Sequence, residues 1–501
     1  MFDNILMGIG VVLQPTNFIC CFFGVLIGTL VGVLPGLGPV GALSILLPTA
    51  VHMSPVQAIV TMSGVYYGCM YGGSTTSILL NIPGEAPSIV TCLDGYQMAR
   101  KGRAGPALGI SAFGSFIGGT AGIILLMLLA VPLIKIALKF GPPEYFSLML
   151  VGIVILTFLS SKSTLKSLAM GAFGIFLGTI GMDPVTGAAR FSFKVNVLID
   201  GIGLAPVAMG LFGISEVLIN IDEGLKQKTF DTRIKGLFPT MQDWKDSTWP
   251  IIRGTFIGFA LGVLPGGGAL LASFTSYAIE KKFSKHPETF GKGAIEGVAG
   301  PETANNAGAQ GNFVPLLVFG LPTHATMALL LAVFVIHGLT PGPLLLKHNP
   351  DVFWGLVMSM YLGNIMLLVL NLPLIGIWVK VLKIPYPLLF PLIFLLCVIA
   401  AYSLNSSVAE ILLMLVFGVL GYFMRKFEYD PAVLVLSMVL SPMIENNFRQ
   451  SLIIYQKGFY IFFQRPISLG LIIMAMFLLV YPLLRKGKQN PLAGIGDSEG
   501  G

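Results

Sequence analysis

Long runs of apolar residues, separated by short polar segments, extend over most of the chain. Within these runs apolar and polar residues do not alternate as they do in half-buried strands, and a helix that crosses a bilayer needs about 20 such residues. We therefore predict an all-α, polytopic membrane protein with room for roughly ten to fourteen crossings. The predicted spans lie at 17–34, 55–82, 106–131, 145–160, 164–182, 202–220, 250–264, 311–337, 351–380, 384–402, 408–424, 431–445 and 464–484.

Two further apolar stretches, 35–51 and 265–280, are shorter and rich in glycine and proline. They predict re-entrant hairpins or helices broken by these residues. The longest polar stretch, 221–249, predicts a linker between two halves of the chain. The polar, glycine-rich tail 485–501 is predicted to be disordered.

The two halves share sequence motifs. Residues 27–38 read IGTLVGVLPGLG and residues 257–268 read IGFALGVLPGGG, so the frame I-G-x-x-x-G-V-L-P-G-x-G recurs 230 positions later. A second match pairs LNIPGEA at 80–86 with FGLPTHA at 319–325. These matches predict two copies of one unit, with boundaries at 17–220 for the first transmembrane repeat, 250–446 for the second, and 464–484 for an extra C-terminal span.

The loops that follow equivalent motifs differ in charge. After the first motif, copy one has no Lys or Arg at 51–56, whereas copy two has Lys281, Lys282, Lys285 and Lys292. After the second motif the bias reverses, with Arg100, Lys101 and Arg103 in copy one and only Lys347 in copy two. Because basic loops stay in the cytoplasm, this favours inverted repeats, an arrangement common in secondary transporters. Parallel repeats are the alternative if each copy has six spans.

Composition agrees with a membrane protein. Of the 501 residues, 55% are hydrophobic and 11% are charged, against about 25% charged in soluble domains. So few charges do not cover the surface of a water-soluble enzyme. The net charge of +7 comes from Lys and Arg scattered over loops, a pattern that does not indicate nucleic-acid binding. The five cysteines lack the spacing of metal ligands or of a disulfide framework, so no transition metal is expected.

Proline and glycine interrupt the helix at the first motif of each copy. Proline removes a backbone donor, glycine relaxes the backbone, and such segments occur in membranes only where protein or a water-filled cavity shelters them. Freed N–H groups and the N-terminus of the next helix can hold an anion. Either break alone is typical of a packing joint. Because both copies carry one, we predict substrate-binding backbone at Pro35, Gly36, Gly38, Pro265, Gly266, Gly267 and Gly268.

Neutral donors and acceptors lie around the second motif of each copy. Hydroxyls and amides suit carboxylate oxygens, and their own oxygens suit a hard cation. Hydroxyls also bond back to their own helix, but amides in apolar surroundings need partners. The further substrate-binding candidates are Ser74, Thr75, Asn305, Asn306 and Thr323. The candidates for coupling to Na⁺ or H⁺ are Asn81, Glu85, Glu302, Asn312 and His324. No other cofactor is expected.

Four acids at span ends, Asp183, Glu216, Asp430 and Glu445, are interpreted as solvated caps, and no arginine is expected inside a span. The chain has no HExxH, GxSxG or Walker A sequence, which disfavours an enzyme and transport driven by ATP through this chain. Ser74 after two glycines, with His324 downstream, leaves an intramembrane hydrolase as an alternative of a different class.

The segments GVLPGLGP, GVLPGGGA, NIPGEAPS, GPETANNA and FGLPTHATMALLLA together resemble the large membrane subunit of the tripartite tricarboxylate transporters, from about residue 17 to residue 484. The resemblance implies a multi-pass permease of the bacterial inner membrane. It further implies uptake of an organic anion, a tri- or dicarboxylate, with Na⁺ or H⁺. The implied partners are a small membrane subunit and a periplasmic substrate-binding protein. A carboxylate symporter that needs no binding protein is an alternative that the sequence leaves open.

Overall fold

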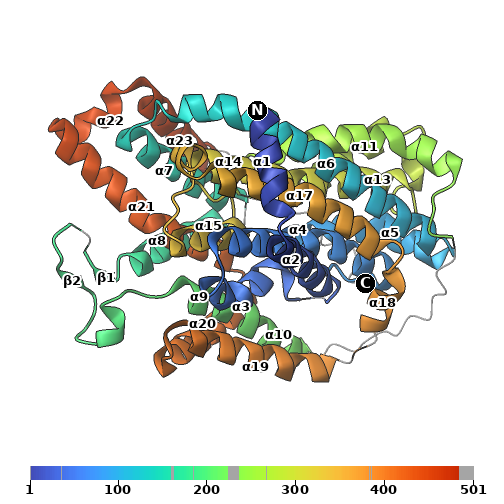
Figure 1. The fold of residues 1–501 in the computed structure, drawn as a ribbon, viewed down its shortest axis with the longest axis horizontal. Helices are drawn as coiled ribbons and strands as arrows, with labels where there is room; N and C mark the ends of the chain where they lie inside the picture. Colours follow the sequence, from blue (N-terminus) through green and yellow to red (C-terminus); the bar gives the residue numbers. More distant parts are fainter. Residues whose placement is uncertain are drawn as a thin grey trace. The chain divides into compact units, whose positions relative to one another are not determined.

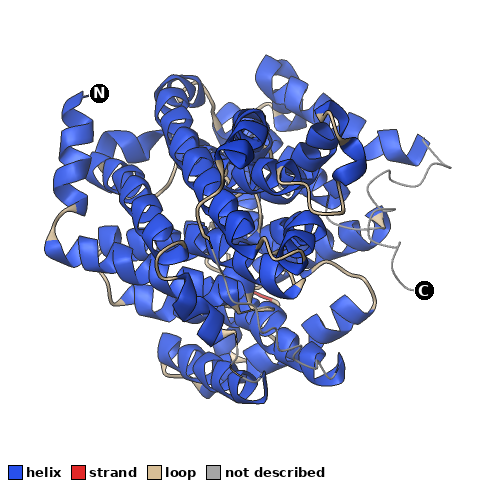
Figure 2. Cartoon of the chain, turned by 90° about the vertical axis from the view of Figure 1, so that its right-hand side faces the viewer, coloured by secondary structure: helices blue, strands red, loops and turns tan. Residues whose placement is uncertain are grey.

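The computed structural model describes residues 2–34, 36–159, 163–183, 185–223, 236–266, 268–382, 384 and 386–484. Within these ranges nearly all regular structure is helical, as Figure 2 shows. The described strands are β1 (Gly181–Met182) and β2 (Ala189–Arg190), an antiparallel pair in which Gly181 faces Arg190. The prediction of an all-α, polytopic protein is confirmed. The predicted tail 485–501 and part of the predicted linker, 224–235, lie outside the described residues.

The chain divides into two compact units, which do not coincide with the predicted repeats. Unit 1 contains Met1–Ala137 and Ala205–Tyr422, and unit 2 contains Leu138–Leu204 and Phe423–Gly501. Each unit therefore draws on both halves of the sequence. The repeat boundaries at 220 and 250 stay a prediction, because a division by compactness is a different property from internal similarity.

The first segment of unit 1 is a series of helices with a break where the sequence predicts one. α2 ends at Val33 and α3 begins at Gly38, with LPGL between them. The helices are α1 (Phe2–Val12), α2 (Pro15–Val33), α3 (Gly38–Val51), α4 (Pro55–Leu80), η1 (Ala86–Ser88), α5 (Ile89–Arg100) and α6 (Ala104–Ala137) (Figure 1). α2 lies along α4, and nearly every residue of α4 is buried.

The second segment of unit 1 repeats this order of long helix, break and buried helix. α11 ends at Gly262, α12 begins at Gly268, and every residue of α13 after Glu296 is buried. The helices are α9 (Leu204–Ala208), the π-helix η3 (Met209–Ile214), α10 (Ser215–Glu223), α11 (Met241–Gly262), α12 (Gly268–Phe283), η4 (Pro287–Thr289), α13 (Glu296–Gly311), α14 (Phe313–Phe319), α15 (Ala325–Ile336), α16 (Pro343–His348), α17 (Pro350–Asn371), α18 (Ile375–Val381), α19 (Tyr386–Asn405) and most of α20 (Val408–Lys426).

Unit 2 is smaller and also helical. Its α8 and α7 pack on α21, and α23 packs on α7. Its helices are α7 (Pro142–Leu159), α8 (Thr164–Gly178), η2 (Asn196–Leu198), α21 (Pro431–Tyr455), η5 (Gly458–Tyr460), α22 (Ile461–Gln464) and α23 (Pro466–Leu484). The hairpin of β1 and β2 lies between α8 and η2 in the sequence.

Fewer helices meet the length and hydropathy expected of a full membrane span than the sequence pattern predicts. Among the described residues there are seven, or eight if the bent pair of α22 and α23 is counted as one span. The predicted span 311–337 is divided into α14 and α15, which have 7 and 12 residues. α3, in the stretch 35–51 that was predicted to be short, has 14 residues. α4 has 26 residues but carries many glycine, serine, threonine and tyrosine residues, which lower its hydropathy. These shorter or more polar helices surround the candidate site.

Three glycines at four-residue spacing line α2, and three more line α11 at positions 230 later. An added Cβ at any of the six would meet the backbone of the neighbouring helix, which is α4 beside α2 and α13 beside α11. Glycine therefore permits close approach of the two backbones in each pair. The residues are Gly24, Gly28, Gly32, Gly254, Gly258 and Gly262.

Contacts within unit 1 join the two predicted copies in a crossed order. Nε2 of His337, just after α15, lies 3.0 Å from the carbonyl oxygen of Ala50 near the end of α3. Lys101, just after α5, donates from Nζ to the carbonyl oxygen of Lys292, in the loop that follows α12, at 2.5 Å. The end of α3 in copy one thus meets the end of α15 in copy two, and the end of α12 meets the end of α5. α6 likewise packs on α13, and α17 on α4.

Candidate functional site

The two predicted breaks have the same backbone geometry at one position. Gly36 has φ +102° and its counterpart Gly266 has φ +103°, a region that side chains rarely tolerate. Gly38 also has a positive φ, +57°, and begins α3, while Gly268 begins α12. Each break therefore leads into a helix N-terminus. Pro265 precedes Gly266 in its turn; the predicted site residues Pro35 and Gly267 lie outside the described residues.

The second motif also has equivalent geometry in the two copies. Asn81 ends α4 with φ +59°, and Gly320 ends α14 with φ +70°, so both helices finish at a left-handed residue. Asn81 is exposed and serves as this helix end. The structure therefore does not bring Asn81 into the buried polar group that its predicted partners form.

Glu302 of α13 lies at the centre of one buried polar cluster. It is 1% exposed and accepts a hydrogen bond on each carboxylate oxygen. Ser74 of α4 donates to Oε2 at 2.5 Å, and Thr91 of α5 donates to Oε1. Three helices are thus joined at one carboxylate. Thr91 was not a sequence candidate, since an isolated threonine in a helix gives no distinguishing signal.

Glu85 and Asn305 form a buried pair beside this cluster. Asn305 donates from Nδ2 to Oε1 of Glu85 at 3.0 Å, so the second motif of copy one meets α13 of copy two. Within the described ranges, the other oxygens of the pair, Glu85 Oε2 and Asn305 Oδ1, have no hydrogen-bond partner. Asn306 donates from Nδ2 to Ser115 Oγ at 2.7 Å. Asn305 and Asn306, whose amides were predicted to need partners, therefore donate to residues of the other predicted copy.

Asn312, Thr323 and His324 form a second cluster, around Tyr66 of α4. Asn312 donates from Nδ2 to Tyr66 Oη at 2.9 Å and accepts on Oδ1 from Thr323 Oγ1 at 3.1 Å. The Tyr66 and His324 rings have centroids 5.9 Å apart. The second break adjoins this cluster, because the N–H of Gly266 donates to the carbonyl oxygen of Thr323 at 2.8 Å. Tyr66 was missed in the sequence, where it lies in an apolar run.

Unit 1 contains acidic side chains in its apolar interior. Glu85 and Glu302 are both buried, and neither takes part in an ion pair among the described residues. A buried carboxylate without a basic partner is costly unless a proton or a cation neutralises it. The region therefore suits a bound cation, and its hydroxyl and amide donors suit carboxylate oxygens.

Glu216 and Asp430 differ in their surroundings. Asp430 caps α21, accepting from the N–H of Ala432 at 2.8 Å, as the sequence predicts. Glu216 instead lies against the first break, where a Cβ on Gly36 would be 2.6 Å from Glu216 Oε1. The carboxylate of α10 follows the π-helix η3, and π-helices frequently occur at functional sites. Its interpretation as a solvated cap is wrong.

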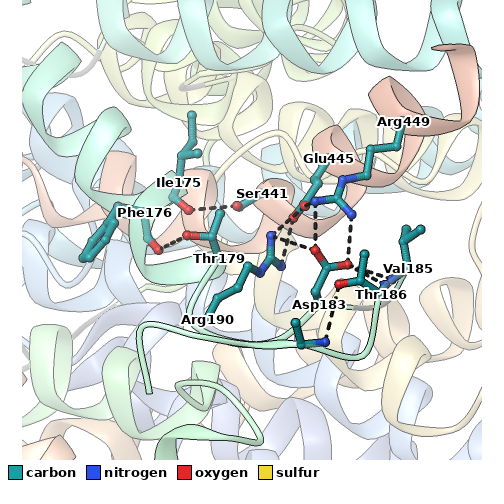
Figure 3. Close-up of polar contacts among 11 residues, drawn as sticks. Ile175, Phe176, Thr179, Asp183, Val185, Thr186, Arg190, Ser441, Glu445 and Arg449 are labelled. Carbon is teal, nitrogen blue, oxygen red and sulfur yellow. Dashed lines mark hydrogen bonds and ion pairs between the residues drawn. The ribbon is translucent and has the colours of Figure 1, made fainter. Parts of the chain in front are cut away.

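Asp183 and Glu445 are also not solvated caps, because an ion-pair network in unit 2 holds both (Figure 3). Arg449 donates to Asp183 from Nη1 and Nη2, both at 2.9 Å. Arg190 donates to Glu445 at 2.7 and 3.2 Å. The hydrogen bonds from Arg449 and from the Val185 N–H hold the pKa of Asp183 well below its usual range. The network fastens the hairpin to α21, and Arg449 shows that a span helix of unit 2 does carry an arginine.

The chain is similar to known proteins over nearly its whole length. A family profile described as "Tripartite tricarboxylate transporter TctA family" matches residues 18–436. An Agrobacterium vitis protein named "Uncharacterized 52.8 kDa protein in TAR-I ttuC' 3'region" is 47% identical over 484 residues, which cover 97% of this chain and 96% of that protein. A second one, "Uncharacterized protein in TAR-II ttuC' 3'region", is 48% identical over 236 residues, or 46% of this chain and 98% of its own length. No solved structure matches the chain.

Proposed function

The chain belongs to the tripartite tricarboxylate transporter TctA family, and we propose that it imports a tri- or dicarboxylate across the bacterial inner membrane. In this proposal Na⁺ or H⁺ drives uptake, a periplasmic binding protein delivers the substrate, and a small membrane subunit completes the transporter. The chain is a multi-pass membrane protein and a transport subunit, not an enzyme. The hydroxyl of Ser74 donates to Glu302, which does not support the serine hydrolase alternative.

The observation that carries the proposal is the pair of equivalent breaks together with polar clusters that both halves share; the second break adjoins one of these clusters through Gly266 and Thr323. Discontinuous helices at the interface of two repeats are where secondary transporters bind substrate and ion. Gly36 and Gly266 supply matched breaks, and the bond between Asn305 and Glu85 joins the halves. The crossed contacts of α3 with α15 and of α12 with α5 support inverted copies, because inversion puts equivalent loops at opposite membrane faces.

The acidic side chains near the breaks give a physical reason for coupling transport to a cation. The acids Glu85, Glu216 and Glu302 lie near the breaks or in the clusters, and they repel an organic anion. A cation that binds with the substrate lowers that repulsion. Backbone N–H groups at the starts of α3 and α12, with the amides of α13, are the proposed carboxylate donors.

Uptake of radiolabelled citrate and related carboxylates tests the proposal. The chain and the small subunit are expressed, with and without the binding protein, in cells that lack their own carboxylate carriers. We expect uptake of at least one carboxylate, and only when all three proteins are present. Uptake of equal rate without the binding protein would establish the independent symporter instead. Absence of uptake for every carboxylate tested, with all three proteins in the membrane fraction or periplasm, would refute the function.

A further inference from the structure

A small cavity lies among α4, α6 and α17 in unit 1. Its volume is about 10 Å³, close to what one water-sized sphere occupies. Five of its seven lining residues carry a side-chain oxygen: Tyr71, Ser74, Thr75, Ser111 and Asn371, with Leu108 and Ala112 completing it. A space of this size accepts one water molecule or one small ion, and it excludes an organic carboxylate.

Asn371 lines this cavity and carries a side-chain acceptor that meets no donor among the described residues. The residue is 4% exposed, and its Nδ2 donates to the carbonyl oxygen of Leu367 one turn earlier, at 2.9 Å. Its Oδ1 is buried and has no hydrogen-bond partner in the part of the chain that the structure describes. An orphaned buried acceptor is unfavourable unless a donor or a cation binds it.

The charge next to the cavity is negative. Ser74 lines the cavity and donates its hydroxyl proton to Glu302 Oε2 at 2.5 Å, which leaves its lone pairs for the cavity. Tyr71 likewise donates to Asn364 Oδ1, so its oxygen also remains an acceptor. The lining therefore presents acceptor oxygens backed by a buried carboxylate that has no basic partner among the described ion pairs. That combination attracts a cation.

We propose that this cavity binds one monovalent cation of the size of Na⁺, with Asn371 Oδ1, Ser111 Oγ and Ser74 Oγ as ligands. Oxygen ligands suit hard cations, and the carboxylate of Glu302, one hydroxyl away, balances the charge. A water molecule would supply a donor to Asn371 but would leave Glu302 without a counter-charge. The inference deepens the proposed function, since it assigns Na⁺ as the coupling ion and gives it a place.

Binding of the cation is measured without transport, on the purified full-length chain in detergent. The thermal unfolding midpoint is recorded in NaCl and in choline chloride at equal ionic strength, and ²²Na⁺ binding is measured in parallel. We expect NaCl alone to raise the midpoint. In Asn371→Leu and Ser111→Ala the Na⁺ concentration for half-maximal binding should rise at least tenfold.

Asn447→Leu is the matched control. Asn447 also donates from Nδ2 to a carbonyl one turn earlier in its own helix, that of Met443, but it belongs to unit 2. We expect this variant to bind ²²Na⁺ as the wild type does. Ser111→Ala removes a single oxygen, so it keeps the test valid if Asn371→Leu does not fold.

The outcomes separate the cation site from the transport function. Absence of ²²Na⁺ binding to the wild type, or equal binding in both cavity variants, overturns the site. Carboxylate uptake in cells that continues without Na⁺ would agree with that result and leave the proposed function standing. Sodium binding without uptake of any carboxylate would leave the site standing and overturn the function.

Discussion

Asn305→Ala is expected to reduce carboxylate uptake tenfold or more, with normal abundance in the membrane. The change removes the hydrogen bond that Glu85 Oε1 accepts from Asn305 Nδ2, in a place that water does not reach. Loss of a bond to a buried charged group costs about 1–3 kcal/mol, and about 1.4 kcal/mol corresponds to tenfold in rate or affinity. The measurement is the initial rate of citrate uptake at saturating binding protein, so that a docking defect does not contribute.

Asn306→Ala should give a loss of the same order, since it removes the bond to Ser115 that joins α13 to α6. Asn447→Ala is the control and should transport at the wild-type rate, since the side-chain bond that it loses among the described residues runs to its own helix in unit 2. Wild-type uptake by both the Asn305 and Asn306 variants would mean that the amides of α13 are structural and that the substrate site lies elsewhere.

Gly258→Ala is expected to lower the thermal unfolding midpoint and the yield of folded protein. The added Cβ would lie 2.7 Å from the Cα atom of Ala304 and 2.9 Å from its carbonyl carbon, both backbone atoms of a buried helix. Neither helix can yield without moving its whole backbone, and overpacking of this kind costs about 1–3 kcal/mol. Gly28→Ala should behave alike, because its Cβ would lie 2.8 Å from the Cα atom of Val65.

Gly470→Ala provides the comparison for this pair. A Cβ there has nothing within 4 Å, so the change adds only helix propensity, and the midpoint should stay the same or rise slightly. If Gly258→Ala and Gly28→Ala leave the midpoint unchanged, as Gly470→Ala does, the close backbone contacts of α11 with α13 and of α2 with α4 are contradicted.

The local features of this fold were predictable because they depend on neighbouring residues. Pro-Gly segments end α2 and α11 where the motifs lie, and the left-handed residues Asn81 and Gly320 fall at equivalent places. Glycine and proline fix these features through backbone conformation alone. The number of full spans was overestimated, because apolar runs such as 311–337 are divided into helices too short to cross, here α14 and α15.

The partners of the polar residues were not predictable, because they are distant in sequence. Asn305 and Glu85 are 220 positions apart, and Arg449 and Asp183 are 266 apart. Periodicity and motif spacing contain no information on such pairs. Asn371 and Ser111 also could not be recognised as site residues in the sequence. A single polar residue in an apolar helix is expected to form a hydrogen bond to the backbone of its own helix. Only the packing of α4, α6 and α17 brings them to one cavity.

The central claim is that two inverted copies of one unit form a single transport path, and cysteine labelling in whole cells tests it most directly. Single cysteines replace Ser54, Arg103 and Lys285 in a chain whose five native cysteines are changed to serine and whose uptake is retained. A membrane-impermeant maleimide should label position 54 in intact cells. Positions 103 and 285 should be labelled only after the cells are opened, because basic loops lie in the cytoplasm. The contact of Lys101 with Lys292 places both loops on one side. Labelling of 54 and 285 from the same side of the membrane would contradict the inverted repeat.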